Sequence, residues 1–333
     1  MMERMSTADP LGEALHSLRM SSSFYSRCVF TAPWGLELPA FSDYLMFHVV
    51  TSGRCWLEVE GAEPCLLQRG DLALVPHGEG HRLASEPGTP AAKLFDIPHN
   101  HLSERYEIIR QGGGGAQTTL LCGVIRFDQP AARHLIGVLP KVIAVEAWSS
   151  PEQEWIQSTL RLMVVEATEL RPGGETIVTR LADILVIQAI RAWIARDPAA
   201  QTGWLGALRD RQVGPAIAAL HREPARPWTV ATLASEAAMS RSAFAARFAE
   251  LVGETPMQYV ARWRMQVAHT WLQEDGATLG ELAFRLGYRS EAAFSRAFKR
   301  FVGVPPGALR RRPDTANDLA VDGVASHTVC GSP

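Results

Sequence analysis

An internal repeat in the last third of the chain constrains the fold more than any other feature of the sequence. The segments 240–256, SRSAFAARFAELVGETP, and 290–306, SEAAFSRAFKRFVGVPP, lie 50 residues apart and match at seven of 17 positions. Each copy follows a short stretch with helical spacing of apolar residues, 229–237 and 278–286, that opens with a threonine able to cap a helix. Two short helices around a tight turn form a helix-turn-helix. The sequence therefore predicts two such units in tandem.

The second helix of each unit has an apolar side and a polar side when it is read with a 3.6-residue period. We expect the apolar sides in the core, and they consist of Phe244, Phe248, Leu251, Phe294, Phe298 and Phe301. The polar side of the first helix is small, with Ser242 and Ala245 between Arg241 and Arg247. Such a surface can lie close to the floor of a major groove and contact thymine methyl groups.

In the second unit, the polar side of the second helix carries charged groups. Arg296 lies at its centre, where a guanidinium can read a base edge. Arg289, Lys299 and Arg300 are placed to contact phosphates. For each of these cations alone, a solvated surface charge is the alternative interpretation. The segment 257–273 has unbroken helical spacing and predicts a rigid spacer, which must match a major-groove repeat of about 34 Å.

The distribution of charge along the chain favours a polyanionic partner. Residues 1–204 contain 17 basic and 23 acidic side chains, whereas residues 205–312 contain 16 basic and 9 acidic ones. Residues 313–333 contain three acidic side chains and no basic one. Lys299 is the one lysine among the 16 cations, and arginine suits bidentate contact with phosphate or guanine. A GC-rich genome explains the choice of arginine equally well. It does not explain why positive charge is concentrated in this region.

The region 213–310 resembles the DNA-binding domain of the AraC family of transcription regulators. The second unit carries the resemblance, with LAFRLGYRSEAAFSRAFK at 282–299 and GVPPGALR at 303–310. The resemblance implies seven helices, with two helix-turn-helix units that enter adjacent major grooves of double-stranded DNA. The base-reading residues that it implies are Arg241, Ser242, Ala245, Glu291, Ser295 and Arg296. We add four flanking contacts to this interface, Arg247, Arg289, Ser290 and Lys299.

Residues from about 24 to 128 have the pattern of short β-strands. Apolar runs such as CWLEV at 55–59 alternate with turn segments rich in glycine and proline, at intervals of about 8 to 12 residues. This rhythm predicts a small β-barrel. The segments 151–170 and 176–196 then show apolar residues at helical spacing, which predicts an antiparallel helical hairpin.

Three stretches of this half, in order, are similar to the cupin-type sensor at the front of a subgroup of AraC-family regulators. They are FHVVTSGRCWLE at 47–58, GDLALVPHGEGH at 70–81 and LLCGVIRF at 120–127. The resemblance covers nearly the whole N-terminal half. It implies a domain that receives a signal.

Together these patterns predict an α+β chain of two domains. We expect a cupin-like sensor barrel at 1–150, a helical hairpin at 151–204 that serves as linker or dimerisation element, and an all-α tandem helix-turn-helix domain at 205–312. The acidic tail, 313–333, is expected to be disordered.

Histidines in the predicted barrel are candidates for a metal site. Cupin enzymes bind a metal through His-x-His, a glutamate and a later histidine, and this chain departs from that pattern. His48 and His81 can converge, with His77 as a third candidate, but buried hydrogen-bonded histidines are the simpler interpretation. The run HNH at 99–101 with Glu104 fits His-x-His-x-x-Glu, and we interpret it as a loop. We therefore predict no metal and no cofactor.

The signal can enter the barrel in two further ways. A small molecule can occupy a pocket, for which His48, Trp56 and His81 are the candidate residues. An oxidant can act on thiols, for which Cys28 and Cys122 are the candidates, although a buried inert thiol is the commoner case. The cysteines are odd in number and lack a CxxC pair, which predicts reduced thiols at Cys28, Cys55, Cys65, Cys122 and Cys330.

These features predict a sequence-specific DNA-binding transcription regulator, not an enzyme. The alternative is a metal-dependent cupin enzyme with a nucleic-acid-binding domain, and the incomplete ligand set argues against it. The predicted partners are double-stranded DNA and a small-molecule or redox effector, with RNA polymerase and a second copy of the chain as further candidates. No apolar run reaches the roughly 18 residues of a membrane span and the N-terminus has no leader pattern, so we expect a cytoplasmic protein without a membrane partner.

Overall fold

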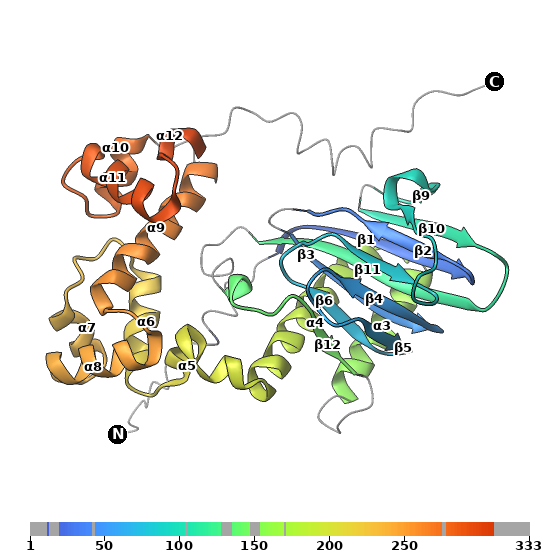
Figure 1. The fold of residues 1–333 in the computed structure, drawn as a ribbon, viewed down its shortest axis with the longest axis horizontal. Helices are drawn as coiled ribbons and strands as arrows, with labels where there is room; N and C mark the ends of the chain where they lie inside the picture. Colours follow the sequence, from blue (N-terminus) through green and yellow to red (C-terminus); the bar gives the residue numbers. More distant parts are fainter. Residues whose placement is uncertain are drawn as a thin grey trace. The chain divides into compact units, whose positions relative to one another are not determined.

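The chain folds into two compact units, which are described separately. The first contains the β-strands and a helical hairpin as far as Trp193, and the second contains the helices from Ile194 onward (Figure 1). The computed structural model describes residues 12, 20–41, 44–103, 105–127, 135–146, 154–169, 171–274 and 278–309.

The first unit is built from two β-sheets. The seven-stranded sheet has the order β12-β6-β3-β11-β1-β10-β9 and the five-stranded sheet the order β5-β4-β7-β2-β8. Neighbouring strands are antiparallel, except that β1 pairs with β10 and β2 with β8 in parallel. The strands are β1 (Met20–Thr31), β2 (Gly35–Leu38), β3 (Tyr44–Ser52), β4 (Arg54–Val59), β5 (Cys65–Gln68), β6 (Leu72–Val75), β7 (His81–Ala84), β8 (Ala92–Lys93), β9 (His99–His101), β10 (Tyr106–Gly112), β11 (Gln117–Phe127) and β12 (Ile143–Val145).

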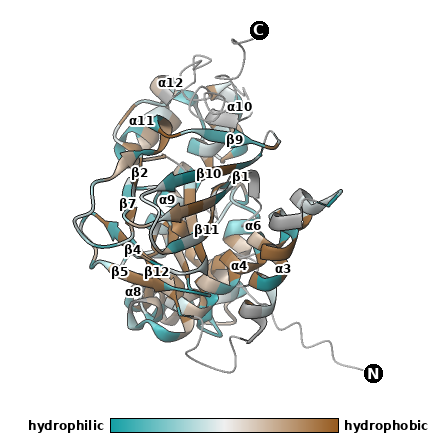
Figure 2. Ribbon diagram, turned by 90° about the vertical axis from the view of Figure 1, so that its right-hand side faces the viewer, coloured by the Kyte–Doolittle hydropathy of each residue, from teal (hydrophilic) through white to brown (hydrophobic). Residues whose placement is uncertain are grey.

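The central strands of the seven-stranded sheet are buried on both faces. One face of β1, β3 and β11 contributes Cys28, Met46 and Cys122 to the main hydrophobic cluster. On the other face Tyr25 and Phe47 are buried too, with their ring centroids 6.1 Å apart. Helices α3 (Glu154–Glu169) and α4 (Gly174–Arg196) lie beside this sheet, and apolar residues colour them and β11 brown (Figure 2). Burial on both faces explains why residues 45–50 of β3 are all buried and, apart from His48, all apolar, instead of alternating with polar residues.

The predicted helical hairpin is observed as α3 and α4, within a few residues of the expected bounds. The pairings of the described strands close neither sheet on itself, so the closed barrel stays a prediction. The interpretation of residues 99–101 as a loop is wrong, because they form β9 and pair with β10. Its partner β10 is buried at four consecutive positions, 106–109, and β9 is the edge strand on which half-exposed histidines are tolerated. The predicted tail lies outside the described residues.

The second unit contains both predicted helix-turn-helix motifs, α7 with α8 and α10 with α11. Their first helices begin and end one residue inside the expected segments, and α9 coincides with the expected spacer within one residue. The elements are η3 (Pro198–Gln201), α5 (Gly203–Arg209), α6 (Val213–Arg222), α7 (Val230–Glu236), α8 (Arg241–Val252), α9 (Pro256–Glu274), α10 (Leu279–Arg285), α11 (Glu291–Val302) and α12 (Pro306–Leu309).

The same capping residues bound the helices in both motifs. Thr229 and Thr278 form reciprocal capping boxes at the first helices. A serine caps each second helix by accepting a hydrogen bond from the backbone N–H three residues on, and a glycine with φ above 80° ends it; these are Ser240, Ser290, Gly253 and Gly303. Repetition of these caps explains why a similarity of seven positions produces the same local fold twice.

Phenylalanine pairs form the centre of each motif. Phe244 and Phe248 are buried with ring centroids 5.5 Å apart, and Phe294 and Phe298 are buried at 5.7 Å. These four expected core positions are confirmed. Leu251 and Phe301, near the helix ends, are half-buried. Among the described residues, no helix has the length and apolar character that crossing a membrane requires.

We predict that Gly123→Val lowers the free energy of unfolding by about 1–3 kcal/mol, because a side chain here must displace buried rings. A Cβ atom at Gly123 would lie 3.0 Å from Cδ1 of Tyr25 and closer still to the ring of Phe47. Gly137→Ala is the matched control, since a Cβ there meets nothing within 4 Å, and it should change the value by less than about 0.5 kcal/mol. Urea unfolding measures both. Equal effects of the two substitutions would show that the packing around Gly123 is not tight.

Candidate functional site

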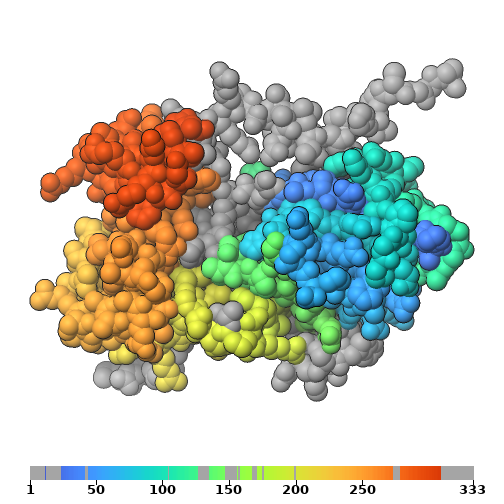
Figure 3. All heavy atoms as spheres, viewed as in Figure 1, coloured from blue at the N-terminus to red at the C-terminus, as the bar shows by residue number. Residues whose placement is uncertain are grey.

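The outward sides of α8 and α11 form the candidate nucleic-acid interface. Both helix-turn-helix segments are visible on the same face of their unit (Figure 3). The predicted contact residues that are exposed are Arg241, Ser242, Arg289, Ser290, Glu291, Arg296 and Lys299, and those that are half-buried are Ala245, Arg247 and Ser295. The structure thus places the ten residues on or beside two exposed helix faces, and their roles remain predictions.

Three of these residues have side-chain partners within the chain. The hydroxyl oxygen of Ser242 lies 3.4 Å from that of Ser240. The Ser290 hydroxyl accepts a hydrogen bond of 3.2 Å from the Ala293 backbone N–H, so it caps α11. Nη2 of Arg247 lies 3.1 Å from Oδ2 of Asp210, and Nη1 lies 3.0 Å from Oε2 of Glu250. Arg247 can therefore contact a phosphate only if its guanidinium is shared with these two carboxylates or if the two ion pairs break. The sequence did not indicate Asp210, because its distance from Arg247 in the chain gives no local signal.

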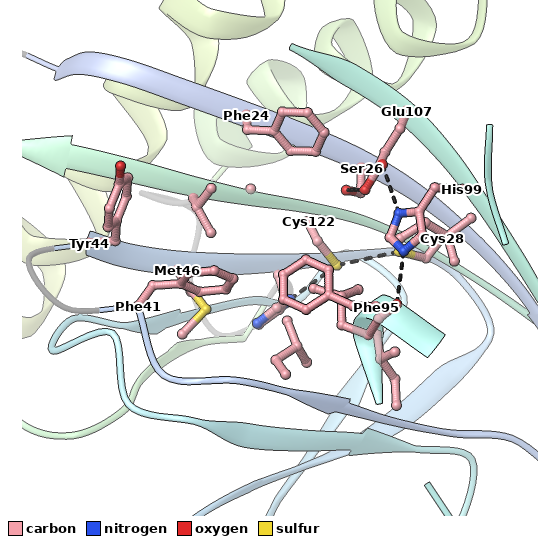
Figure 4. Close-up of a pocket in the computed structure, with 17 residues that line it drawn as sticks. Phe24, Ser26, Cys28, Phe41, Tyr44, Met46, Phe95, His99, Glu107 and Cys122 are labelled. Carbon is pink, nitrogen blue, oxygen red and sulfur yellow. Dashed lines mark hydrogen bonds and ion pairs between the residues drawn. The ribbon is translucent and has the colours of Figure 1, made fainter. Parts of the chain in front are cut away.

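A pocket in the first unit is lined by residues of both sheets (Figure 4). It contains about 710 Å³ of space, including the part open to solvent. Its lining is mostly apolar, and it consists of Phe24, Ser26, Cys28, Leu36, Leu38, Phe41, Tyr44, Met46, His48, Leu94, Phe95, His99, Glu107, Ile109, Cys122, Gly123 and Val124. An apolar concavity with a few polar groups is the usual form of a small-molecule site.

A buried carboxylate marks the polar end of this pocket. Glu107 is 2% exposed, and its two oxygens accept hydrogen bonds from the Ser26 hydroxyl at 2.6 Å and from Nδ1 of His99 at 2.8 Å. Nε2 of His99 lies 2.8 Å from the Leu94 carbonyl. Both ring nitrogens of His99 thus face acceptors, which assigns the doubly protonated imidazolium. The hydrogen bond to Glu107 raises the pKa of His99, in agreement with this assignment.

A chain of thiols and histidines runs inward from the same pocket. Sγ of Cys28 lies 4.0 Å from Sγ of Cys122, which lies 3.1 Å from Nδ1 of His48. Nε2 of His48 is 2.7 Å from Nε2 of His81, whose Nδ1 faces the Glu79 carbonyl at 2.9 Å. That carbonyl can only accept, so Nδ1 of His81 donates to it, Nε2 of His48 donates to His81, and the Cys122 thiol donates to His48. Burial lowers the pKa of both histidines, which keeps the chain neutral.

Hydrogen bonding and burial also decide the state of the thiols. The hydrogen bond with Cys28, followed by burial, raises the pKa of Cys122 well above its usual range. Burial raises the pKa of Cys55 to about 12. The described cysteines, Cys28, Cys55, Cys65 and Cys122, are free. Cys122 therefore lines the pocket as a protonated thiol.

The structure brings some of the predicted sensor residues together and separates others. His48, Cys28 and Cys122 line the pocket, and His81 lies behind His48 in hydrogen-bonding contact. Trp56 is not among the described lining residues and lies half-buried on β4. His77 bonds instead to the Leu139 carbonyl, at 2.9 Å. Among the described residues, no cluster of three or more His, Cys, Asp or Glu side chains can hold a metal ion.

Sequence reasoning missed the pair formed by His99 and Glu107. Glu107 interrupts the apolar run YEII of β10 at a position whose neighbours are buried. A charged residue within such a run was the available signal, because buried carboxylates need partners. The histidine partner became visible only with the pairing of β9 on β10.

Comparison with known proteins agrees with both halves of the chain. Residues 9–195 match the family described as "Cupin", and residues 233–312 match the "Helix-turn-helix domain". The chain is 37% identical over 307 residues to a "Putative AraC-like transcription regulator" from Streptomyces lividans, covering 92% of this chain and 99% of that protein. It is 30% identical over 308 residues to the HTH-type transcriptional regulator AlkR from Acinetobacter baylyi, covering 91% and 99%.

Among solved structures, the DNA-binding domain of AdpA in complex with a target DNA is 34% identical, covering 30% of this chain and 94% of that chain with a TM-score of 0.28. The fold and the sequence matches define a class of regulator in which a cupin domain precedes a helix-turn-helix domain. The chain belongs to the AraC family of transcription regulators.

We predict that the free energy of unfolding falls on both sides of about pH 6.5 through different histidines. The folded pKa of His99 is raised above 6.5, so its contribution is complete below about pH 6.5 and is lost as pH rises through the folded pKa. His48 and His81 have lowered folded pKa values, so their contribution is present above about pH 6.5 and is lost as pH falls.

Urea unfolding of His99→Gln between about pH 5 and pH 9 tests this assignment. In this variant the free energy of unfolding should no longer fall on the alkaline side of about pH 6.5 and should still fall on the acid side. Arg54→Gln, which breaks an exposed ion pair with Glu86, is the control and should keep both. An unchanged alkaline decline in His99→Gln would contradict the imidazolium assignment.

Proposed function

We propose that the chain binds specific double-stranded DNA through α8 and α11 and regulates transcription when a small molecule occupies the pocket of the first unit. The observation that carries the proposal is the repeated helix-turn-helix, with the same caps and the same buried phenylalanine pair in each copy. That repetition presents two exposed helix faces in a region rich in arginine. A DNA target supports a cytoplasmic location.

The exposed faces of α8 and α11 make different kinds of contact with DNA. Arg296, exposed on α11, offers a bidentate donor to a guanine edge, with Glu291 and Ser295 beside it. On α8 the small surface of Ser242 and Ala245 supports close approach and contact with thymine methyl groups. Arg241 joins Ser242 and Ala245 as a base reader on this helix. The residues that position the protein on phosphates are Arg247, Arg289, Ser290 and Lys299.

We predict that Arg296→Ala weakens binding to the cognate duplex by about 1–3 kcal/mol and relaxes preference at one base pair, because a guanine contact is lost. Lys299→Ala is the matched control on the same helix. It should weaken binding uniformly across sequences and reduce the slope of log affinity against log salt by about one. Affinity measured on a set of single-base variants separates the two effects. Uniform weakening by Arg296→Ala would assign Arg296 to a phosphate instead.

For the signal we rank a small ligand above thiol oxidation, and oxidation above a metal. The pocket is open to solvent and mostly apolar, which supports a ligand. The raised pKa of Cys122 argues against a reactive thiolate at rest, since reactivity needs a lowered pKa. Thiol oxidation remains a second candidate because the Sγ atoms of Cys28 and Cys122 are 4.0 Å apart on one sheet face, although a disulfide needs about 2.05 Å.

We predict that Cys28→Ser and Cys122→Ser leave regulation intact in a reporter assay, with and without an oxidant. The reason is that both thiols are buried and that the raised pKa of Cys122 disfavours the reactive thiolate there. Cys65→Ser is the control, because Cys65 is half-buried and does not line the pocket. If an oxidant response exists and either pocket variant abolishes it while the control does not, the thiols are the sensor and the ranking is reversed.

Two further partners belong to the proposal. Helices α3 and α4 carry exposed apolar side chains, at which we place the contact of a homodimer: Leu162, Val165, Ile177 and Ile184. RNA polymerase is the partner through which a bound regulator would act on transcription. The enzyme alternative has no support in the named relatives, which are regulators.

A further inference from the structure

The pocket has two chemically different ends. Phe41, Tyr44 and Met46 lie toward one end, and Ser26, His99 and Glu107 lie toward the other (Figure 4). Between them the lining is aliphatic, aromatic or sulfur-containing. A molecule that fills this space must therefore have an apolar body and a polar group at one end.

The polar end can accept hydrogen bonds but has no donor to offer. The Ser26 hydroxyl donates to Glu107 at 2.6 Å, and Nδ1 of His99 donates to the other carboxylate oxygen at 2.8 Å. Nε2 of His99 donates to the Leu94 carbonyl at 2.8 Å. Each described donor at this end is thus already used. A carboxylate has about four lone-pair sites, so Glu107 keeps acceptor capacity after these bonds.

The middle of the pocket also lacks a free hydrogen-bond donor among the described residues. The Cys28 thiol donates to Cys122, and the Cys122 thiol donates to His48, so the protons of both thiols are occupied. A bound anion would find no free donor at this end, because both protons of the His99 imidazolium, which offsets the charge of Glu107, are already used. A donor group of a ligand would meet an acceptor that is 2% exposed and held in place by Ser26 and His99, with Nδ1 of His101 3.5 Å from the same oxygen as His99.

We infer that the pocket selects apolar molecules that end in a hydrogen-bond donor, such as lipophilic alcohols and amines, and disfavours fatty carboxylates. The donor group sits against Glu107 near Ser26 and His99, and the apolar body extends toward Phe41 and Met46. This inference rests on the proposed function, in which the pocket is the ligand site, and specifies the class of ligand.

Titration calorimetry of the full chain with three probes of equal length, octylamine, octanol and octanoate, tests the inference at neutral pH. Octylamine and octanol, which carry donors, should each bind at least about tenfold more tightly than octanoate, which carries none. This ranking on the unaltered protein requires no variant to fold. Octanoate that binds as tightly as octylamine would overturn the inference and leave the pocket as a ligand site. Failure of all three to bind would overturn both the inference and the proposed ligand role.

Variants assign the preference to one carboxylate. Glu107→Gln preserves the shape of the side chain and should weaken the binding of octylamine by about tenfold without weakening the binding of octanoate. Glu86→Gln removes a carboxylate that is 60% exposed and should change none of the three affinities. Phe95→Ala trims the apolar wall and should weaken all three probes by a similar factor. Octylamine affinity that is unchanged in a folded Glu107→Gln variant would overturn the inference.

Discussion

The packing of aromatic side chains between α6 and α9 is the constraint on which the DNA-binding half depends. The His221 ring stacks on Trp263 with centroids 3.6 Å apart, and its Nε2 lies 2.8 Å from the Tyr259 hydroxyl. Tyr259 and Trp263 are both buried. This packing joins α9 to α6, which contacts α7 and α8 of the first motif, and α9 also contacts α12 and α11 of the second motif. A helix of 19 residues is about 28 Å long, so α9 can hold two reading helices near the spacing of adjacent major grooves.

The sensor unit depends on a different balance of burial and polarity. Its seven-stranded sheet is mostly apolar on both faces, yet the unit encloses Glu107, His48 and His81, which are almost fully buried. Buried polar groups of this kind are tolerated only when hydrogen bonds satisfy them, and here two separate networks do so. One network is neutral, and the other contains an ion pair. Members of both networks line the pocket, so the polar groups that a ligand meets there are already hydrogen-bonded to one another.

The sequence predicted the DNA-binding half in more detail than the sensor half, for a physical reason. Helix caps and the 3.6-residue period are local signals, so the bounds of α7, α9 and α10 were predictable within one residue. The buried phenylalanine pairs followed from the same period. The contact of Arg247 with Asp210 did not, since ion pairs between distant segments leave no trace in local spacing.

In the sensor half the strands were predictable and their pairing was not. Cys28, Cys122 and His48 were candidates by residue type, but their convergence depends on the register of β1, β3 and β11. Trp56 was a reasonable pocket candidate by chemistry, although it is not among the described lining residues. Residues 99–101 were interpreted as a loop because they follow the main hairpins of the predicted barrel and precede the glycine run at 112–115. Pairing of β9 with β10 brought His99 to Glu107 and created the polar end of the pocket.

The central claim is that two reading helices, held apart by α9, contact one face of a DNA duplex. Hydroxyl-radical footprinting of the full chain on an operator found by genomic mapping tests it most directly. The account predicts two protected stretches on the same face, centred about one helical turn, or 10 to 10.5 base pairs, apart. A single protected stretch, or two stretches on opposite faces of the duplex, would contradict it.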